Sequence, residues 1–149
     1  MRVINRDIAG AFIFSSDGKV LLGKSTQGGA YEDLWVVPGG GIEPGESKLE
    51  ALKREIKEEL GLNLEDSQIE PITTQSQGQS EKDIKETGER ALVKMTFWDF
   101  KVTLSQPADQ VKFSLDDDLS EAKFFTMNEL PKLKLGGGTS GSLKRMGYL

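Results

Sequence analysis

Two residue types with frequent chemical roles are missing from this sequence, which contains neither cysteine nor histidine. Without cysteine there is no disulfide, no thiolate nucleophile and no thiolate metal site. Without histidine there is no imidazole metal ligand and no Ser-His-Asp or Cys-His catalysis. Any bound metal must therefore be held by oxygen atoms, which favours Mg²⁺ or Mn²⁺ and also permits Ca²⁺.

The sequence also lacks an apolar run long enough to span a bilayer, so we expect no membrane partner. The first apolar run is short, contains Asp7 and has no cleavage-like end, so we do not interpret it as a signal peptide and expect a cytoplasmic protein. With 19 basic and 24 acidic residues, the net charge of −5 argues against nucleic-acid binding. The length of 149 residues suits one domain, residues 1–149, with a real core.

The strongest structural signal is the stretch from Gly40 to Leu62, which reads GGIEPGESKLEALKREIKEELGL. Ser47 followed three residues later by Glu50 forms a capping box, so a helix is predicted to begin near Ser47. Gly61 stands where a C-cap glycine belongs. The apolar stripe that we expect this helix to bury consists of Leu49, Leu52, Ile56 and Leu60.

Three carboxylates of this helix, Glu55, Glu58 and Glu59, have spacings of three and four and so share one face. They lie beside the apolar stripe, at the edge of the expected core. A glycine-rich turn at residues 38–41 comes just before, and glycine lets a backbone approach a ligand closely. Together these features suggest a divalent metal that holds phosphates. The same three carboxylates would also fit a helix face that is only exposed to solvent and binds no metal.

The rest of the chain predicts a mixed sheet around this helix. Strands are expected at residues 8–14, 20–22, 34–37, 68–74, 91–104 and 121–125. The first two form a hairpin, and Pro71 indicates that the fourth is an edge strand. Loops are expected at residues 75–88, which we interpret as mobile, and at residues 105–112. A short helix capped by Asn128 should reach Leu130, and the glycine-rich segment 136–141 should be flexible. The expected fold class is α/β or α+β in a layered sandwich.

The stretch from Gly40 to Leu62 resembles the Nudix box at every defining position. The matching residues are Gly40, Glu46, Arg54, Glu55, Glu58, Glu59 and Gly61, with the intervening apolar positions Ile56, Leu60 and Leu62. The resemblance implies a Nudix-type α/β/α sandwich with a mixed β-sheet. It also implies a MutT-like, Mg²⁺-dependent pyrophosphohydrolase that cleaves a nucleoside diphosphate linked to a group X, either a nucleoside triphosphate or a nucleotide sugar.

The resemblance assigns metal ligation to Glu55, Glu58 and Glu59, with the carbonyl of Gly39 completing the shell. One of Glu58 and Glu59 would also act as the general base, or position it. The resemblance further implies that Arg54 and Glu46 pair and hold the loop against the helix.

In this family a further acidic ligand often comes from a loop before the last strand. Asp118 is our choice for that ligand, with Asp117 and Glu121 as alternatives. The family usually carries a solid C-terminal helix, whereas here only a broken one is expected.

Three other residues are candidates for substrate binding. Trp35 precedes the glycine turn and would stack on a base or sugar, although a core tryptophan is the commoner case. Lys24 and Arg90 would meet a phosphate, against the alternative that both are ordinary surface cations.

Two other functions are compatible with the resemblance. One is a non-catalytic Nudix module that senses a nucleotide, but such domains usually have eroded boxes and this box is intact. The other is pyrophosphohydrolysis at RNA 5′ ends, which the acidic charge balance disfavours. A homodimer is also considered, since family members often dimerise, although no interface is identifiable in the sequence.

Overall fold

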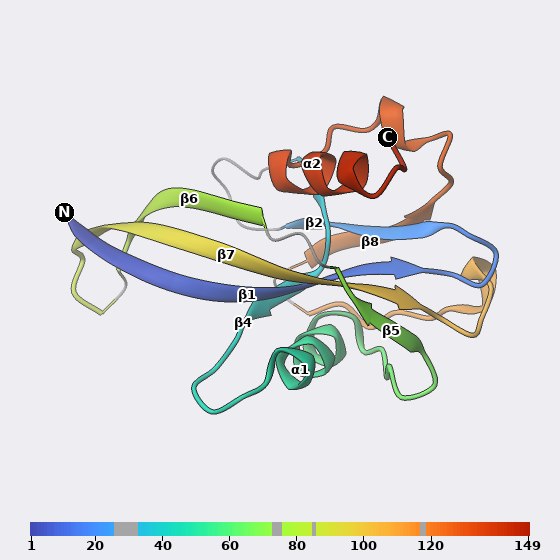
Figure 1. Cartoon of the computed structure of the whole chain (residues 1–149), viewed down its shortest axis with the longest axis horizontal. Helices are drawn as coiled ribbons and strands as arrows, with labels where there is room; N and C mark the ends of the chain where they lie inside the picture. The colour runs from blue at the N-terminus through green and yellow to red at the C-terminus, as the bar shows by residue number, and fades with distance from the viewer. Residues whose placement is uncertain (26–32, 73–75, 85, 117–118) are drawn as a thin grey trace.

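The computed structural model describes residues 1–25, 33–72, 76–84, 86–116 and 119–149. These residues form a mixed sheet with α1 on one face and α2 on the other, which is the expected sandwich (Figure 1). The strands are β1 (Arg2–Phe14), β2 (Val20–Ser25), β3 (Trp35–Val36), β4 (Gly39–Gly41), β5 (Gln68–Pro71), β6 (Ser76–Asp83), β7 (Arg90–Thr103) and β8 (Leu119–Phe125). The helices are α1 (Lys48–Leu60) and α2 (Gly137–Arg145), with 3₁₀ turns η1 (Ala108–Gln110) and η2 (Leu130–Lys132).

The sheet is built on β1 and β7, which run parallel from Arg2 opposite Ala91 to Phe14 opposite Thr103. The other pairings are antiparallel: β2 and β4 pair with β1, β5 and β6 pair with β7, and β3 and β8 pair with β2. The sheet is therefore mixed, and the β1–β2 hairpin is confirmed. Because β1 pairs with β7 along its whole length, β1 begins at Arg2. The predicted start at Ile8 is therefore wrong.

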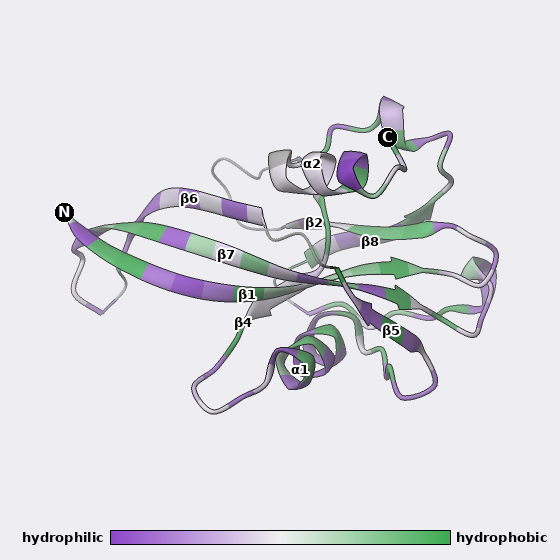
Figure 2. Cartoon of the chain, in the orientation of Figure 1, coloured by the Kyte–Doolittle hydropathy of each residue, from purple (hydrophilic) through white to green (hydrophobic). Residues whose placement is uncertain are grey.

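Alternate side chains of β1 enter two different cores. Ala9, Ala11 and Ile13 pack with the apolar stripe of α1. Phe12 and Phe14 pack on the opposite face, in a cluster that includes Leu143 of α2. Figure 2 shows hydrophobic stretches along both β1 and β7, including the segments near their arrowheads. Burial on both faces of the same strands fixes where each helix lies.

Helix α1 follows the predicted caps closely. Ser47 and Glu50 form the capping box, and Gly61 has the left-handed φ of 68° of a C-cap. The predicted apolar stripe is wrong at one end, because Leu49 is 40% exposed. Ala51 is buried instead, so the stripe lacks its first predicted member. Helical period alone does not bury a side chain, which also needs a facing surface.

The predicted mobile loop at residues 75–88 is wrong, because Ser76–Asp83 form strand β6. This strand pairs antiparallel with β7, from Ser76 opposite Phe97 to Asp83 opposite Arg90. Most of its side chains are polar and exposed, so the sequence has no apolar alternation to reveal it. Backbone pairing with the long strand β7 is enough to define such an edge strand.

The predicted flexible segment at residues 136–141 is also wrong, because α2 continues unbroken from Gly137 to Arg145. Glycine and serine have poor helix propensity, but Leu143 is fully buried and Thr139 and Ser142 are nearly so. Tertiary packing therefore overrides local preference in this helix. Neither α1 nor α2 is long and apolar enough to cross a membrane, and no other helix in the described ranges is.

Smaller predicted boundaries also shift. The helix expected at Asn128 is instead η2, which follows Glu129 and contains Pro131. The glycine-rich turn forms the short strand β4, because its backbone pairs with residues 8–10 of β1. The loop expected at residues 105–112 contains η1, and the strand expected at residues 34–37 is reduced to Trp35–Val36.

Candidate functional site

The predicted acidic site lies where α1 crosses β4. The backbone N–H of Gly39 donates to Oε1 of Glu59 at 3.1 Å, and the Glu59 residue is only 7% exposed. A Cβ atom built on Gly40 would overlap the carboxylate of Glu55. The glycines of β4 thus let two carboxylates of α1 lie directly against a strand backbone.

Strand β4 is also held tightly against β1. Gly39 has φ of 155°, and a Cβ there would collide with the carbonyl oxygen of Ala9. Only glycine fits at this position without moving one of the two strands. Because the sheet fixes β4 in this way, the backbone that faces Glu55 and Glu59 is preorganised.

Arg54 connects the loop, the strand and the helix. Its Nε donates to Oε2 of Glu46 at 2.7 Å, and its Nη2 donates to Oε1 of Glu46 at 2.9 Å. Nη2 also donates to the carbonyl of Gly41 at 2.9 Å. The predicted pairing of Arg54 with Glu46 is therefore confirmed. These hydrogen bonds hold the pKa of Glu46 down at about 2, well below its ordinary value.

The same guanidinium also reaches two of the candidate metal ligands. Nη1 of Arg54 donates to Oε1 of Glu55 at 2.9 Å and to Oε2 of Glu58 at 3.4 Å. Burial raises the pKa of Glu55, and the hydrogen bond from Arg54 opposes that increase. The Glu58 side chain is 56% exposed. Of the three glutamates, Glu59 is therefore buried and Glu58 is exposed.

In the part of the chain that the structure describes, no group of three or more acidic side chains is gathered closely enough to hold a metal ion. Arg54 lies against Glu55 and Glu58, while Glu59 accepts the N–H of Gly39. The residue types nevertheless fit a hard divalent cation, which prefers carboxylate and carbonyl oxygens as ligands. Residues Glu55, Glu58 and Glu59 with the Gly39 carbonyl would hold such an ion.

Asp118 and Asp117, two candidates for the further acidic ligand, lie outside the described residues. The segment before them does approach the helix, since the N–H of Asp116 donates to the carbonyl of Glu59 at 3.3 Å. The third candidate, Glu121, is exposed on β8 opposite Lys24 of β2. The structure does not bring Glu121 into the cluster around Arg54.

The predicted substrate-binding residues lie elsewhere. Trp35 is 8% exposed and packs edge-on against Phe125 at 4.8 Å, in the core beneath α2. Nζ of Lys24 lies 4.7 Å from the centre of the Trp35 ring. Arg90 pairs with Asp83 of β6 at 3.2 Å. Because Arg90 is seven positions before Phe97, it lies roughly 23 Å along β7 from the level of β4.

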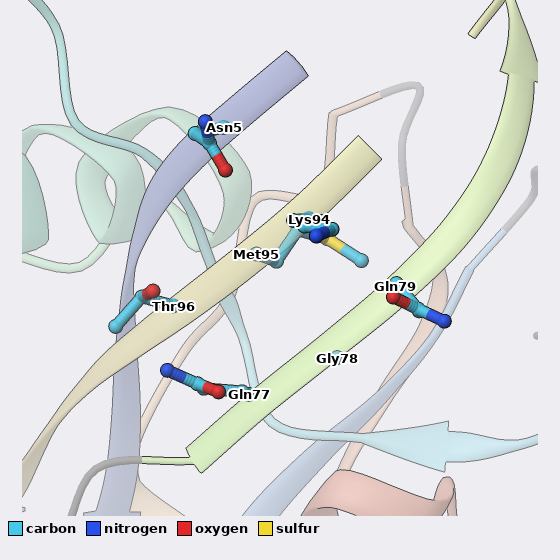
Figure 3. Close-up of a pocket in the computed structure, with 7 residues that line it drawn as sticks. All are labelled: Asn5, Gln77, Gly78, Gln79, Lys94, Met95 and Thr96. Carbon is cyan, nitrogen blue, oxygen red and sulfur yellow. The ribbon is translucent and has the colours of Figure 1, made fainter. Parts of the chain in front are cut away.

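A separate hollow of about 350 Å³ lies over β1, β6 and β7. Figure 3 shows the amides of Asn5, Gln77 and Gln79 around it, together with Lys94 and Thr96. None of the predicted site residues lines this hollow. It is therefore not part of the acidic site.

The sequence reasoning missed two residues on the α2 face. The Arg6 guanidinium lies close enough to Gly41 that a Cβ there would overlap it. Asp99 of β7 is 7% exposed, and burial raises its pKa to about 6 while Arg145 opposes the increase. One signal for Asp99 was available: it follows Ala91 and Val93 at even spacing, where an inward-facing side chain is expected.

The model of the NUDIX domain family matches residues 4–145. Nucleoside triphosphatase NudI of Enterobacter sp. (strain 638) is 45% identical over 60 residues, covering 40% of this chain and 43% of the relative. NudI of Escherichia coli (strain K12) is 45% identical over 62 residues, covering 41% and 44%. The chain thus spans less than half the length of the curated relatives it matches.

Solved structures share the fold at low sequence identity. The E. coli dihydroneopterin triphosphate pyrophosphohydrolase has a TM-score of 0.72 and 15% identity, covering 95% of this chain and 96% of that chain. The NUDIX domain of Shewanella oneidensis NrtR, complexed with ADP ribose, has a TM-score of 0.65 and 16% identity, covering 95% and 86%. The M. Smegmatis Nudix hydrolase RenU has a TM-score of 0.64 and 18% identity, covering 95% and 84%.

Proposed function

Because this chain belongs to the Nudix hydrolase family, we propose that it hydrolyses the phosphoanhydride bond of nucleoside triphosphates, with Mg²⁺ as its metal. We also propose that residues 1–149 form one catalytic domain. The observation that carries the proposal is the junction of α1 and β4, where Glu59 accepts the Gly39 N–H and Glu55 lies against Gly40. The similarity to NudI nucleoside triphosphatases supports the triphosphate over the nucleotide sugar.

A divalent cation bound there would neutralise phosphate charge and lower the pKa of water. The protein supplies the arrangement around it. Gly39 holds Glu59 at the base of the site, and Arg54 orients Glu55 from the side. Glu58, which is the most exposed of the three, is open to an attacking water molecule. In the reaction, the water oxygen bonds to phosphorus, the phosphoanhydride bond breaks and the proton passes to a glutamate.

The test is a substrate panel with product identification by mass. The four ribonucleoside and four deoxyribonucleoside triphosphates, two nucleotide sugars and a 5′-triphosphorylated RNA are each incubated with Mg²⁺, Mn²⁺ or Ca²⁺. The proposal expects nucleoside monophosphate and pyrophosphate, or diphosphate and phosphate, from triphosphates with Mg²⁺. If products formed only from the nucleotide sugars or only from the RNA, the assigned substrate would be contradicted. Nucleotide binding without any turnover would instead favour the sensor function.

A further inference from the structure

Strand β6 lies at the outer edge of the ribbon that it forms with β7 and β1 (Figure 1). Within the described ranges β6 pairs with β7 alone, and no backbone hydrogen bond from another element reaches its residues. The backbone N–H and C=O groups that point away from β7 therefore form an open edge along Ser76–Asp83. Such an edge is a template on which another strand can pair.

The first five residues of β6 lack the features that usually protect an open edge. Natural edge strands are protected by lysine, by proline or by a bulge. Residues 76–80 read SQGQS, with no charged residue and no proline. Their pairing with β7 continues without a shift of register. This part of the edge is therefore open to pairing with a strand of another molecule.

The same five residues form a palindrome around Gly78. Two identical strands related by a two-fold axis must be self-complementary, because each residue contacts its counterpart in both directions. With the axis at Gly78, Gln77 lies opposite Gln79 of the second copy. Ser76 likewise lies opposite Ser80 of the second copy. Carboxamides both donate and accept hydrogen bonds, so the glutamines suit each other, and Gly78 brings no side chain to the axis.

The hydroxyl of Ser80 supports this register. Its Oγ is buried and has no hydrogen-bond partner among the described residues. A buried polar atom without a partner costs free energy, so a partner gained on assembly is favourable. Opposite residues of an antiparallel pair have Cβ atoms about 5 Å apart, and serine hydroxyls there can bond after rotation about χ1. Ser76 of the second copy supplies that partner.

The charged end of β6 also favours this register over its alternatives. Glu81, Lys82 and Asp83 follow the palindrome, so with the axis at Gly78 they do not face their counterparts. With the axis at Lys82, Glu81 would instead lie opposite Asp83 of the second copy. Like charges directly opposite each other destabilise a strand pair. The acidic residues thus oppose a register that is shifted towards the end of the strand.

We propose that two copies of this chain form a dimer by antiparallel pairing of β6 with β6, about a two-fold axis at Gly78. The sheets of the two copies become one continuous sheet. The paired segment is short, so the interface is smaller than that of a permanent dimer and the association is weak.

The first test measures the mass of the full chain by analytical ultracentrifugation from about 1 µM to about 1 mM, a range that covers weak association. Wild type should shift from the mass of one chain towards twice that mass as the concentration rises. Amide hydrogen exchange within residues 76–80 should slow over the same range, because open N–H groups become paired. The mass of a single chain at every concentration would overturn the proposal, as would protection that appears only outside β6.

The second test uses two double variants that differ only at position 77. Gln77→Glu with Gln79→Glu places like charges across both glutamine pairs, whereas Gln77→Lys with Gln79→Glu places opposite charges there. The second variant should dimerise about fivefold or more tightly than the first. Both side chains are exposed in the single chain, so the fold should be kept, and circular dichroism checks this.

Equal dimerisation of the two variants would show that residues 77 and 79 do not face each other and would overturn the proposal. The exchange measurement on wild type keeps the test decisive if either variant fails to fold. None of these measurements depends on hydrolysis, so their outcome is independent of the proposed function.

Discussion

The guanidinium of Arg54 holds both oxygens of the Glu46 carboxylate, with Nε 2.7 Å from Oε2 and Nη2 2.9 Å from Oε1. Two parallel hydrogen bonds fix the relative orientation of these side chains as well as their distance. Since Nη2 also reaches the carbonyl of Gly41, the pair ties the loop before α1 to β4. The candidate site is thus assembled around a structural ion pair.

The first prediction concerns acid stability. Arg54 lowers the pKa of Glu46 from 4.5 to about 2 in the folded protein. A carboxyl group whose pKa is lower in the folded protein than in the unfolded chain stabilises the folded protein at pH values above its unfolded pKa. That stabilisation is lost as the pH falls towards 2. Glu46→Gln should therefore melt below wild type at pH 6, with the difference shrinking as the pH falls from 4.5 to 2. Thermal unfolding followed by circular dichroism measures this.

Glu70→Gln is the matched control, because Glu70 is exposed on β5. Its melting temperature should follow that of wild type at each pH. A difference between Glu46→Gln and wild type that stayed constant from pH 6 to pH 2 would contradict the assignment of the shift to Arg54.

The second prediction concerns the buried glutamate. Glu59→Gln should lower kcat by about 10² or more, because it removes a ligand charge and a candidate base. The fold should be kept, since the glutamine oxygen can still accept the N–H of Gly39. Steady-state kinetics with Mg²⁺ on the best triphosphate of the panel measures the loss.

Glu50→Gln makes the same chemical change on the same helix and should keep full activity, since glutamine also completes a capping box. If Glu59→Gln and Glu50→Gln showed equal kcat values, Glu59 would have no place in the chemistry. Without metal, Glu59→Gln should be as stable as wild type or more so, because fewer like charges are clustered.

The third prediction concerns the contact between β4 and α1. Gly40→Ala places a Cβ where the Glu55 carboxylate lies, so the carboxylate or the helix must move. We expect a loss of stability of about 1–3 kcal/mol. Activity should fall more than stability explains, because Glu55 loses its position. Urea unfolding and kinetics on the same preparation separate the two effects, and unchanged activity would show that the position of Glu55 is unimportant.

The fourth prediction concerns α2. A Cβ on Gly138 would meet nothing within 4 Å, whereas one on Gly136 would lie 2.9 Å from Cγ1 of Val36. Gly138→Ala should therefore stabilise the protein by about 0.5–1 kcal/mol through helix propensity. Gly136→Ala should destabilise it. Urea unfolding of both variants is the measurement, and the same sign for both would contradict the packing of α2 against β3.

The fifth prediction concerns the pH dependence that Asp99 produces. Burial raises its pKa from 3.8 to about 6 in the folded protein. A carboxyl group whose pKa is higher in the folded protein than in the unfolded chain contributes its full stabilisation below pH 3.8, where it is protonated in both states. That stabilisation is lost as the pH rises through 6. The free energy of unfolding of Asp99→Asn minus that of wild type should therefore grow by up to about 3 kcal/mol between pH 4 and pH 7. A flat difference across that range would show that Asp99 titrates normally.

Helix α1 was predictable because its determinants are local. Its capping box, C-cap glycine and acidic face all lie within one stretch of sequence, and the box resemblance named Arg54 and its partner Glu46 correctly. The long strand β7 was predictable for the same reason, since its alternation is visible without knowledge of its neighbours.

Features that depend on distant partners were not predictable. Strand β6 is polar and exists through pairing with β7, and α2 is rich in glycine and held by the burial of Leu143. The burial of Asp99 likewise depends on Gly10 and on α2, neither of which is near it in sequence. Local patterns show which secondary structure a segment favours. The formation of β6 and α2 and the burial of Asp99 depend instead on contacts with residues distant in the sequence.

The parallel pairing of β1 with β7 has a consequence for how the protein folds. Arg2 lies opposite Ala91 and Phe14 opposite Thr103, so the two middle strands come from distant parts of the chain. Contacts between distant segments form slowly, because a long loop must close before they are made. During synthesis β1 leaves the ribosome well before β7, so the edge of β1 that pairs with β7 stays open until β7 is made. Competition from aggregation should therefore make the refolding yield fall as protein concentration rises.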